Sequence, residues 1–416
     1  MSSPLHRRAL HPLVRRLAEA RRRSPDGEVV SGHHNTNLVL PLGTPLAWLL
    51  GQRSAGALAK FRTPRQAVEV VPRLWRQESE LLRVLDGRVS HVPRCLADFG
   101  AWSLHEYLPG PTLAEVAPPG QRVGPDRLTA LAAFFAELAG VPRADLPPLP
   151  DDWPDDGDSE GFLAWLARFT EQRVHQANRP RFGMLFDAVG IPFDAVERFL
   201  GTLRAPAQRP FTLLHTDVHR ANVLVLPAGE GERLAVIDWE LALFGDPLHD
   251  LATHLVRMDY VKEEREVMID LWAQAMRSGG HGEMTADLDR GLRTYRDFEH
   301  VQSLYPDVMR AALYLSERPA ERELSEAADR VCRALHRAWR PLGLTGVPRD
   351  ESEVGEALRR WHAADREWRT RSAKDLPGGD AITPDDITRR PRRQRLRVRT
   401  PRPAAAERRE PTGVRS

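Results

Sequence analysis

The stretch that decides the fold reads LLHTDVHRANVLV over residues 213–225 and is followed by LAVIDWE over residues 234–240. Apolar residues on both sides of the polar segment predict two short strands that flank an exposed loop. Asp217 and Asn222 are five residues apart on this loop, so both side chains are expected to face one pocket. A second predicted strand pair ends at Asp238.

These residue types suit phosphoryl transfer. That reaction needs a carboxylate to orient and deprotonate the acceptor hydroxyl, and ligands for the metal that holds the β and γ phosphates. Magnesium takes one or two oxygen ligands from the protein and the rest from phosphates and water. Asp217, Asn222 and Asp238 supply such oxygens, and the pattern therefore indicates a phosphotransferase.

The order of these motifs resembles a known family. His-x-Asp-x-x-x-x-Asn, from His215 to Asn222, precedes Ile-Asp-Trp-Glu at residues 237–240. This arrangement looks like the aminoglycoside phosphotransferase and choline kinase family, the small-molecule branch of the protein-kinase-like fold. The run FGDPLHDLA at residues 244–252 is also similar to that family, in which an aspartate of this turn and helix caps the helix or anchors the metal loop.

The resemblance implies a role for each polar residue of the loop. Asp217 takes the place of the catalytic base, and Asn222 and Asp238 take the places of the magnesium ligands. His215 is implied as a scaffold residue beneath the loop. His219 stands two residues after the base, where protein kinases usually carry lysine and this branch often carries histidine.

Simpler explanations exist for several of these residues. A histidine such as His215 is more often buried for structural reasons than reactive. Asp246 and Asp250 can be helix-cap carboxylates without any catalytic role. Glu240 can help to position metal or substrate, or can be a surface glutamate. The two aspartates of the motif can be turn residues beside strands, which the flanking pattern disfavours.

The segment expected to cover the nucleotide phosphates spans residues 27–40 and predicts a strand, a turn and a second strand. It lacks a full Gly-x-Gly-x-x-Gly pattern. Backbone amides and the side chains of Ser31 and Asn35 can still reach phosphate oxygens. A plain β-hairpin turn is the alternative.

A cation on the third strand should pair with a glutamate on the following helix and hold the nucleotide phosphates. Lys60 lies in Leu-Ala-Lys-Phe, which reads like the corresponding kinase strand, whereas Arg73 lies directly before the helix. Pro72 would confine the second segment to a sheet edge, so Lys60 is favoured and Arg73 stays open. Glu78 is the expected partner, although a glutamate at a helix start is also stabilised by the helix dipole.

The pattern of elements predicts an α+β, protein-kinase-like fold with a small β-rich N-lobe and a larger helical C-lobe. In the N-lobe one helix over 76–85 interrupts predicted strands over 28–31, 37–42, 57–62, 68–75, 95–99 and 103–108. The C-lobe is expected to contain helices over 128–138 and 161–174, a β patch over 211–239, and further helices to about residue 363. The predicted divisions are a basic lead-in (1–26), the nucleotide-binding N-lobe (27–108), the C-lobe (109–370) and a disordered Arg/Pro-rich tail (371–416).

The link over residues 104–110 resembles the family's hinge. Glu106 and Leu108 lie in it, and their backbone groups are expected to bind the base of ATP or GTP.

The composition limits the compartment and the class of protein that can be expected. The chain has 416 residues, a formal net charge of +2, two cysteines (Cys95 and Cys332) and three lysines (Lys60, Lys262 and Lys374). Two distant thiols cannot form a disulfide framework or a zinc cluster. No run of about 18 apolar residues appears, so a cytoplasmic protein without a membrane span is expected.

The predicted function is transfer of the γ-phosphoryl group of ATP or GTP, with Mg²⁺, to a hydroxyl of a small molecule. An acidic run over residues 151–160 would attract a cationic acceptor, although a solvated acidic loop is the preferred explanation. Residues 293–310 carry polar and aromatic side chains that are candidates for the acceptor pocket. The alternative function is a non-catalytic nucleotide-binding regulatory protein with the same fold. Nucleic-acid binding by the arginine-rich tail is a third interpretation, and solubility is the preferred explanation of that tail.

Overall fold

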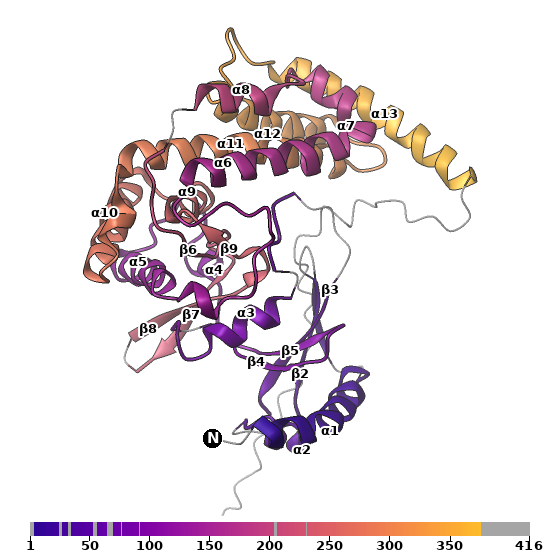
Figure 1. Cartoon of the computed structure of the whole chain (residues 1–416). Helices are drawn as coiled ribbons and strands as arrows, with labels where there is room; N and C mark the ends of the chain where they lie inside the picture. Colours follow the sequence, from indigo (N-terminus) through magenta and orange to yellow (C-terminus); the bar gives the residue numbers. More distant parts are fainter. Residues whose placement is uncertain are drawn as a thin grey trace, which may run out of the picture.

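The structure is a computed structural model that describes residues 4–24, 27–31, 35–52, 56–64, 70–75, 77–90, 92–203, 206–229 and 231–375. It has a smaller, sheet-containing lobe and a larger, mainly helical lobe (Figure 1). Residues 107–112 connect the two lobes and follow the last strand of the small one.

The small lobe contains a five-stranded antiparallel sheet in the order β1-β2-β3-β5-β4. Its strands are β1 (Glu28–Ser31), β2 (Asn35–Pro41), β3 (Leu58–Pro64), β4 (Cys95–Asp98) and β5 (Ser103–Glu106). The helices α1 (Pro4–Arg22) and α2 (Thr44–Leu49) share an apolar core with one face of this sheet. Helix α3 (Glu78–Leu85) precedes β4 and matches the helix predicted over 76–85.

One predicted strand, over residues 68–75, is wrong. Residues 70–75 form bends and irregular backbone, and residues 65–69 lie outside the described part of the chain. Pro72 has no backbone N–H to donate to a neighbouring strand, which weakens any ladder through this segment. Arg73 therefore reaches the site from a loop.

The alternation of β3 decides which of its side chains face the large lobe. Ala59 and Phe61 are buried in the core that the sheet shares with α1 and α2. Successive strand residues point to opposite faces, so Lys60 and Arg62 share the other face. Pairing of Lys60 with Val39 in β2 and with His105 in β5 makes β3 a central strand. This central position places the side chain of Arg62 at the junction of the lobes.

The large lobe contains ten helices in the described residues. They are α4 (Leu113–Val116), α5 (Pro125–Ala139), α6 (Ser159–Phe169), α7 (Ala177–Ala188), α8 (Ala195–Thr202), α9 (Pro247–Arg257), α10 (Lys262–Ser278), α11 (Leu288–Leu313), α12 (Glu321–Trp339) and α13 (Glu351–Asp375). A π-helical segment, Thr170–Gln176, joins α6 to α7. The helices predicted over 128–138 and 161–174 are thus present. Helix α13 extends to Asp375, past the predicted start of the tail, and residues 376–416 lie outside the described part.

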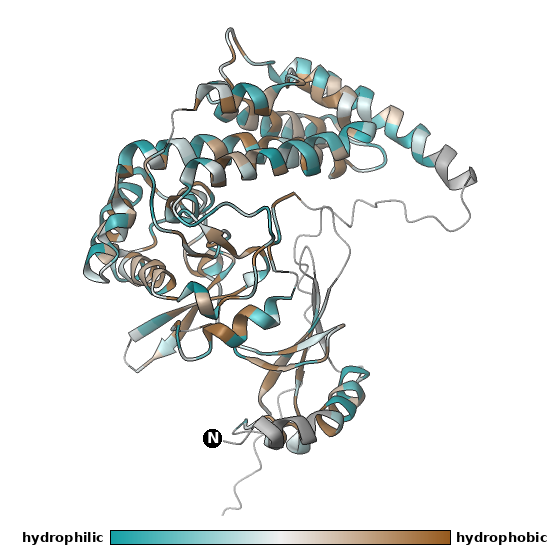
Figure 2. Cartoon of the chain, viewed as in Figure 1, coloured by the Kyte–Doolittle hydropathy of each residue, from teal (hydrophilic) through white to brown (hydrophobic). Residues whose placement is uncertain are grey.

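Four short strands lie inside the large lobe and carry the site. β6 (Thr212–Leu214) pairs with β9 (Leu243–Gly245), and β7 (Val223–Ala228) pairs with β8 (Gly231–Val236). All residues of β6 and β9 are buried, and Figure 2 shows hydrophobic residues gathered around these strands, with more hydrophilic helices outside them. Among the helices of the described residues, none is long and apolar enough to cross a bilayer.

Candidate active site

The loop between β6 and β7 brings the polar motif residues together. The Asn222 amide donates to Oδ2 of Asp217 at 2.9 Å and to its backbone carbonyl at 3.0 Å. The backbone carbonyl of Asn222 accepts from the N–H of Ile237 at 2.9 Å, which brings the loop beside the end of β8. Asp238 follows directly, so the base candidate and both metal-ligand candidates lie at one end of the β7–β8 pair.

The loop is held by the helix that follows β9. Oxygens of Asp250, which is buried in α9, accept the backbone N–H groups of His215 at 2.7 Å and Thr216 at 2.8 Å. Thr216 has a φ of +60°, which is costly for a β-branched residue, by about 1–3 kcal/mol. Its hydroxyl donates to the carbonyl of Leu241 at 2.6 Å and helps to offset this cost. Asp246 caps α9 by accepting from the N–H of Leu248.

Replacement of Asp250 by Asn tests this support. One of the two acceptor oxygens becomes an NH₂ group that faces a backbone N–H, so one buried donor loses its partner. We expect the free energy of unfolding to fall by about 1–3 kcal/mol. Because the loop carries Asp217, kcat should fall more than nucleotide affinity. Chemical denaturation and steady-state kinetics measure the two effects, and a variant with wild-type stability and kcat would show that the loop does not depend on this carboxylate.

Two further residues support the loop from below. His215 is fully buried, its ring centroid lies 4.6 Å from that of Trp239, and burial lowers the pKa of His215 to about 4. A neutral ring whose Nδ1 accepts from the N–H of Asp217 at 3.2 Å suits a scaffold role. Arg220 is also buried and donates to several carbonyls of the large lobe, including that of Met258 at 2.7 Å. Sequence reasoning missed Arg220, because its role depends on distant carbonyls.

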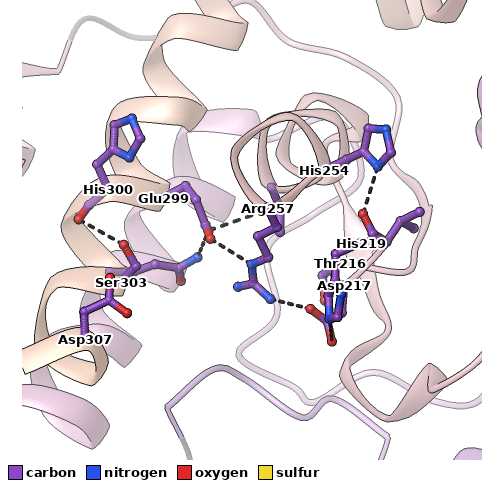
Figure 3. A network of polar contacts seen from close by, with 12 residues as sticks. Thr216, Asp217, His219, His254, Arg257, Glu299, His300, Ser303 and Asp307 are labelled. Atoms are coloured by element: carbon purple, nitrogen blue, oxygen red, sulfur yellow. Dashed lines mark hydrogen bonds and ion pairs between the residues drawn. The ribbon is translucent and has the colours of Figure 1, made fainter. Parts of the chain in front are cut away.

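The Asp217 carboxylate is surrounded by cationic or polarisable groups. Nη1 of Arg257 in α9 lies 2.5 Å from its Oδ1, and Nε2 of His219 lies 3.5 Å from its Oδ2 (Figure 3). Burial opposes ionisation, but His219 and Arg257 outweigh it and hold the pKa of Asp217 well below its usual range. Asp217 is therefore ionised at neutral pH.

Asp238 and Asn222 offer oxygen atoms for a hard cation. Asp238 has a φ of +72°, and its Oδ1 is 3.0 Å from Nη2 of Arg62. Despite burial, Arg62 and Lys60 lower the pKa of Asp238. Among the described residues no donor reaches Oδ2 of Asp238 or Oδ1 of Asn222. This donor set fits Mg²⁺ with phosphates and water as its other ligands. No cluster of three His, Cys, Asp or Glu residues suited to a metal occurs in the part described.

A buried network around Arg62 joins the lobes. Its guanidinium lies 2.8 Å from Oε2 of Glu78, 3.0 Å from Asp238 and 2.9 Å from Glu240. The other oxygen of Glu78 accepts the backbone N–H of Trp239 at 2.9 Å. One arginine of the small lobe thus links α3 to the segment that contains the candidate metal ligand.

The expected pairing of Glu78 with Lys60 or Arg73 is wrong, since Glu78 pairs with Arg62. Lys60 lies near these charged groups. Burial is the largest cause that lowers the pKa of Lys60, and repulsion from Arg62 is the second. Arg73 lies 3.6 Å from Glu240 instead. The signal for Arg62 was present in the sequence, because residues two apart on a strand share a face.

Glu240 is a buried member of the network rather than a surface residue. Burial, followed by repulsion from Asp238, raises its pKa to about 8, although Arg62 opposes the shift. The 2.9 Å contact with Arg62 keeps the side chain in place. From this position Glu240 can hold the side chains of Arg62 and Arg73 next to the candidate metal ligand Asp238.

The remaining nucleotide-site candidates are partly outside the described structure. The tip of the predicted phosphate loop, residues 32–34, and the side chains of Ser31 and Asn35 lie outside it. Glu106 ends β5, and its carboxylate pairs with Arg94 at 3.0 Å. Leu108 packs against an apolar cluster formed by β7 and β8. Its neighbour Gly110 approaches β7 so closely that a Cβ would lie 2.8 Å from a backbone oxygen.

The acidic run before α6 has structural uses. Asp156 accepts the N–H of Phe211 at 2.6 Å, Asp158 caps α6 through the N–H of Gly161, and Asp152 contacts the indole N–H of Trp165. These contacts favour the simpler explanation of the run.

Together, the two lobes and the loop geometry define a kinase-like α+β architecture. The chain belongs to the phosphotransferase enzyme family, whose sequence model matches residues 47–286. A comparison with curated proteins found no match.

A comparison with solved structures found a protein of similar fold. A protein from Ralstonia eutropha JMP134, proposed to be an aminoglycoside phosphotransferase, is 16% identical with a TM-score of 0.51, over 80% of this chain and 97% of that one. An ethanolamine kinase from Plasmodium vivax is 11% identical with a TM-score of 0.48, over 78% and 85%. A choline/ethanolamine kinase family protein from Mesorhizobium loti is 16% identical with a TM-score of 0.45, over 83% and 99%.

Proposed function

We propose that this protein transfers the γ-phosphoryl group of ATP or GTP to a hydroxyl of a small molecule. The observation that carries the proposal is the convergence of Asp217, Asn222 and Asp238 at one end of the β7–β8 pair. Family membership supports the reaction class. The likeness to a proposed aminoglycoside phosphotransferase supports a polyhydroxylated acceptor as the first class to test.

In this mechanism the chain acts mainly by positioning. Asp217 accepts a hydrogen bond from the acceptor hydroxyl and takes its proton as the acceptor oxygen bonds to the γ-phosphorus. The bond from the γ-phosphorus to the β–γ bridging oxygen breaks, and the nucleoside diphosphate leaves. Asn222 and Asp238 would hold Mg²⁺, which would neutralise charge on the β and γ phosphates. Arg62 keeps Asp238 in place through their 3.0 Å contact. Such preorganised charges need no rearrangement during the reaction.

Replacement of Asp238 by Ala is expected to weaken the magnesium–nucleotide complex. The variant removes both carboxylate oxygens: Oδ2, which no donor reaches among the described residues, and Oδ1, which pairs with Arg62. We expect the Kd for the magnesium nucleotide to rise at least about tenfold, a free-energy change of roughly 1.4 kcal/mol. Titration calorimetry with and without Mg²⁺ measures the change. An unchanged magnesium dependence would remove Asp238 from the metal site.

The function itself is tested by magnesium-dependent nucleotide consumption across a panel of aminoglycosides, amino alcohols, sugars and other hydroxylated metabolites. We expect one acceptor class to accelerate consumption and to yield a phosphate monoester. Slow nucleotide turnover that no acceptor accelerates would favour a nucleotide-binding regulatory protein instead.

A further inference from the structure

The two carboxylate oxygens of Asp217 have different surroundings. The group that contacts Oδ1 has no role in the reaction described so far. Oδ2 faces residues of its own loop, Asn222 and His219. Oδ1 faces Arg257, at the C-terminal end of α9. Figure 3 shows that this arginine lies between the loop and α11 and contacts carboxylates on both sides.

We propose that Arg257 is a positioning residue for the phosphoryl transfer, and that Glu299 holds its guanidinium in the orientation that fixes the Asp217 carboxylate. This inference rests on the proposed function. The residues concerned come from three elements, the loop after β6, the end of α9 and the middle of α11.

The contacts give Arg257 a defined geometry. Nη1 lies 2.5 Å from Oδ1 of Asp217, and Nε lies 3.0 Å from Oε1 of Glu299. An arginine fork can satisfy two carboxylates from fixed positions, which a lysine cannot do. With Arg257 on one oxygen and Asn222 on the other, the carboxylate of Asp217 is held at two points, so rotation of its plane is blocked.

Glu299 is itself held on α11. It is 1% exposed, and its Oε2 accepts from the hydroxyl of Thr253 at 3.4 Å and from the amide of Gln302. Burial of a carboxylate costs free energy unless an opposite charge compensates for it. For Glu299, the ion pair with Arg257 is this compensation. The chain Glu299–Arg257–Asp217 therefore connects the interior of the large lobe to the loop.

Arg257 also sets the charge felt by Asp217. Charged or titratable groups face this carboxylate from its own loop, from the end of β8 and from α9: His215, His219, Asp238, Asp250 and Arg257. Two are carboxylates, which repel a second negative charge. Arg257 is the one permanent cation in this group, and it offsets that repulsion through its contact with Oδ1.

Two variants separate the effect of the positioning contact of Arg257 from the effect of its positive charge. Arg257→Met removes both, whereas Arg257→Lys keeps the charge but loses the fork. For Arg257→Met we expect kcat to fall roughly ten- to a hundredfold, the size of effect that small misplacements produce. Arg257→Lys should lose less kcat than Arg257→Met, because it keeps the positive charge beside Asp217.

Glu299→Gln tests the second link. It keeps the shape and one acceptor for Nε but removes the charge, so we expect the same changes as in Arg257→Met, but smaller. In the double variant with Arg257→Met, the effect of Glu299→Gln should largely vanish, because it acts through an arginine that is absent. Nucleotide KM should stay within about twofold in all variants, since none of these groups is a candidate nucleotide ligand.

A matched control is Arg179→Met, since Arg179 is an α7 arginine of similar exposure (23% against 27%) that pairs with Asp187. It should leave kcat and the nucleotide KM unchanged. A folded Arg257→Met enzyme with a wild-type kcat would overturn the proposal, as would full additivity in the double variant. If Arg257→Met does not fold, a wild-type kcat in Arg257→Lys and Glu299→Gln would overturn it. An inactive wild-type protein would instead refute the proposed function.

Discussion

An Asp217→Asn enzyme is expected to lose phosphoryl transfer almost completely, with kcat lower by about 10²–10⁴-fold. The amide cannot take the proton of the acceptor hydroxyl and no longer pairs with Arg257 at Oδ1. Asp217→Ala should act in the same direction. The Kd for the magnesium nucleotide should change little, because the candidate metal ligands are Asn222 and Asp238. Single-turnover kinetics and nucleotide titration measure these two quantities.

The isosteric Asn variant is the control for the Ala variant, since it keeps a side chain beside Asn222. A thermal melt shows whether either protein remains folded. Full activity in folded Asp217→Asn would remove this residue from the reaction, and equal full activity in Asp238→Ala would remove the whole site assignment.

Loss of Arg62 is expected to have the largest effect on stability. Arg62→Met leaves Glu78, Asp238 and Glu240 close together without their shared cation. Breaking a buried ion pair from one side typically costs about 3–5 kcal/mol, so the free energy of unfolding should fall by roughly that amount. Nucleotide affinity should fall as well, because the link between α3 and Asp238 is lost.

Lys60→Met is the matched control for Arg62→Met. Both side chains lie on the same face of β3, but Lys60 makes no ion pair with these carboxylates in the described part of the chain. We expect it to be less destabilising. Chemical denaturation and nucleotide titration of both variants decide between the two cations. Severe loss of stability in Lys60→Met with little loss in Arg62→Met would reverse the assignment.

The fold could be predicted from the sequence because its signals are local. Alternating and β-branched runs gave the strands of the small lobe, and Gly and Pro marked the link to the helical lobe. The strand predicted over residues 68–75 was wrong, since its apolar residues resemble a strand while Pro72 lacks a ladder donor. The tail was predicted to begin at residue 371, whereas helix α13 extends to Asp375. The end of this helix was missed because polar helices carry weaker sequence signals.

The site was predictable where one motif holds several residues. Asp217 and Asn222 share a loop, and Asp238 follows a short strand nearby, so spacing alone predicted their proximity. Arg62 was missed because Lys60 has the expected residue type in a chain with few lysines. Arg257 was also missed, and the candidate Glu299 was given no defined role, because both depend on the packing of α9 against α11. No spacing rule reports that kind of contact.

The central claim is that the loop after β6 and the end of β8 form a phosphoryl-transfer centre. The most direct measurement is phosphorus NMR of the wild-type protein and Asp217→Asn, each with magnesium nucleotide and the acceptor panel. We predict a new phosphate monoester with at least one acceptor, formed only by the wild type and only with Mg²⁺. Equal monoester formation by both proteins, or nucleotide binding with no monoester from any acceptor, would contradict this account.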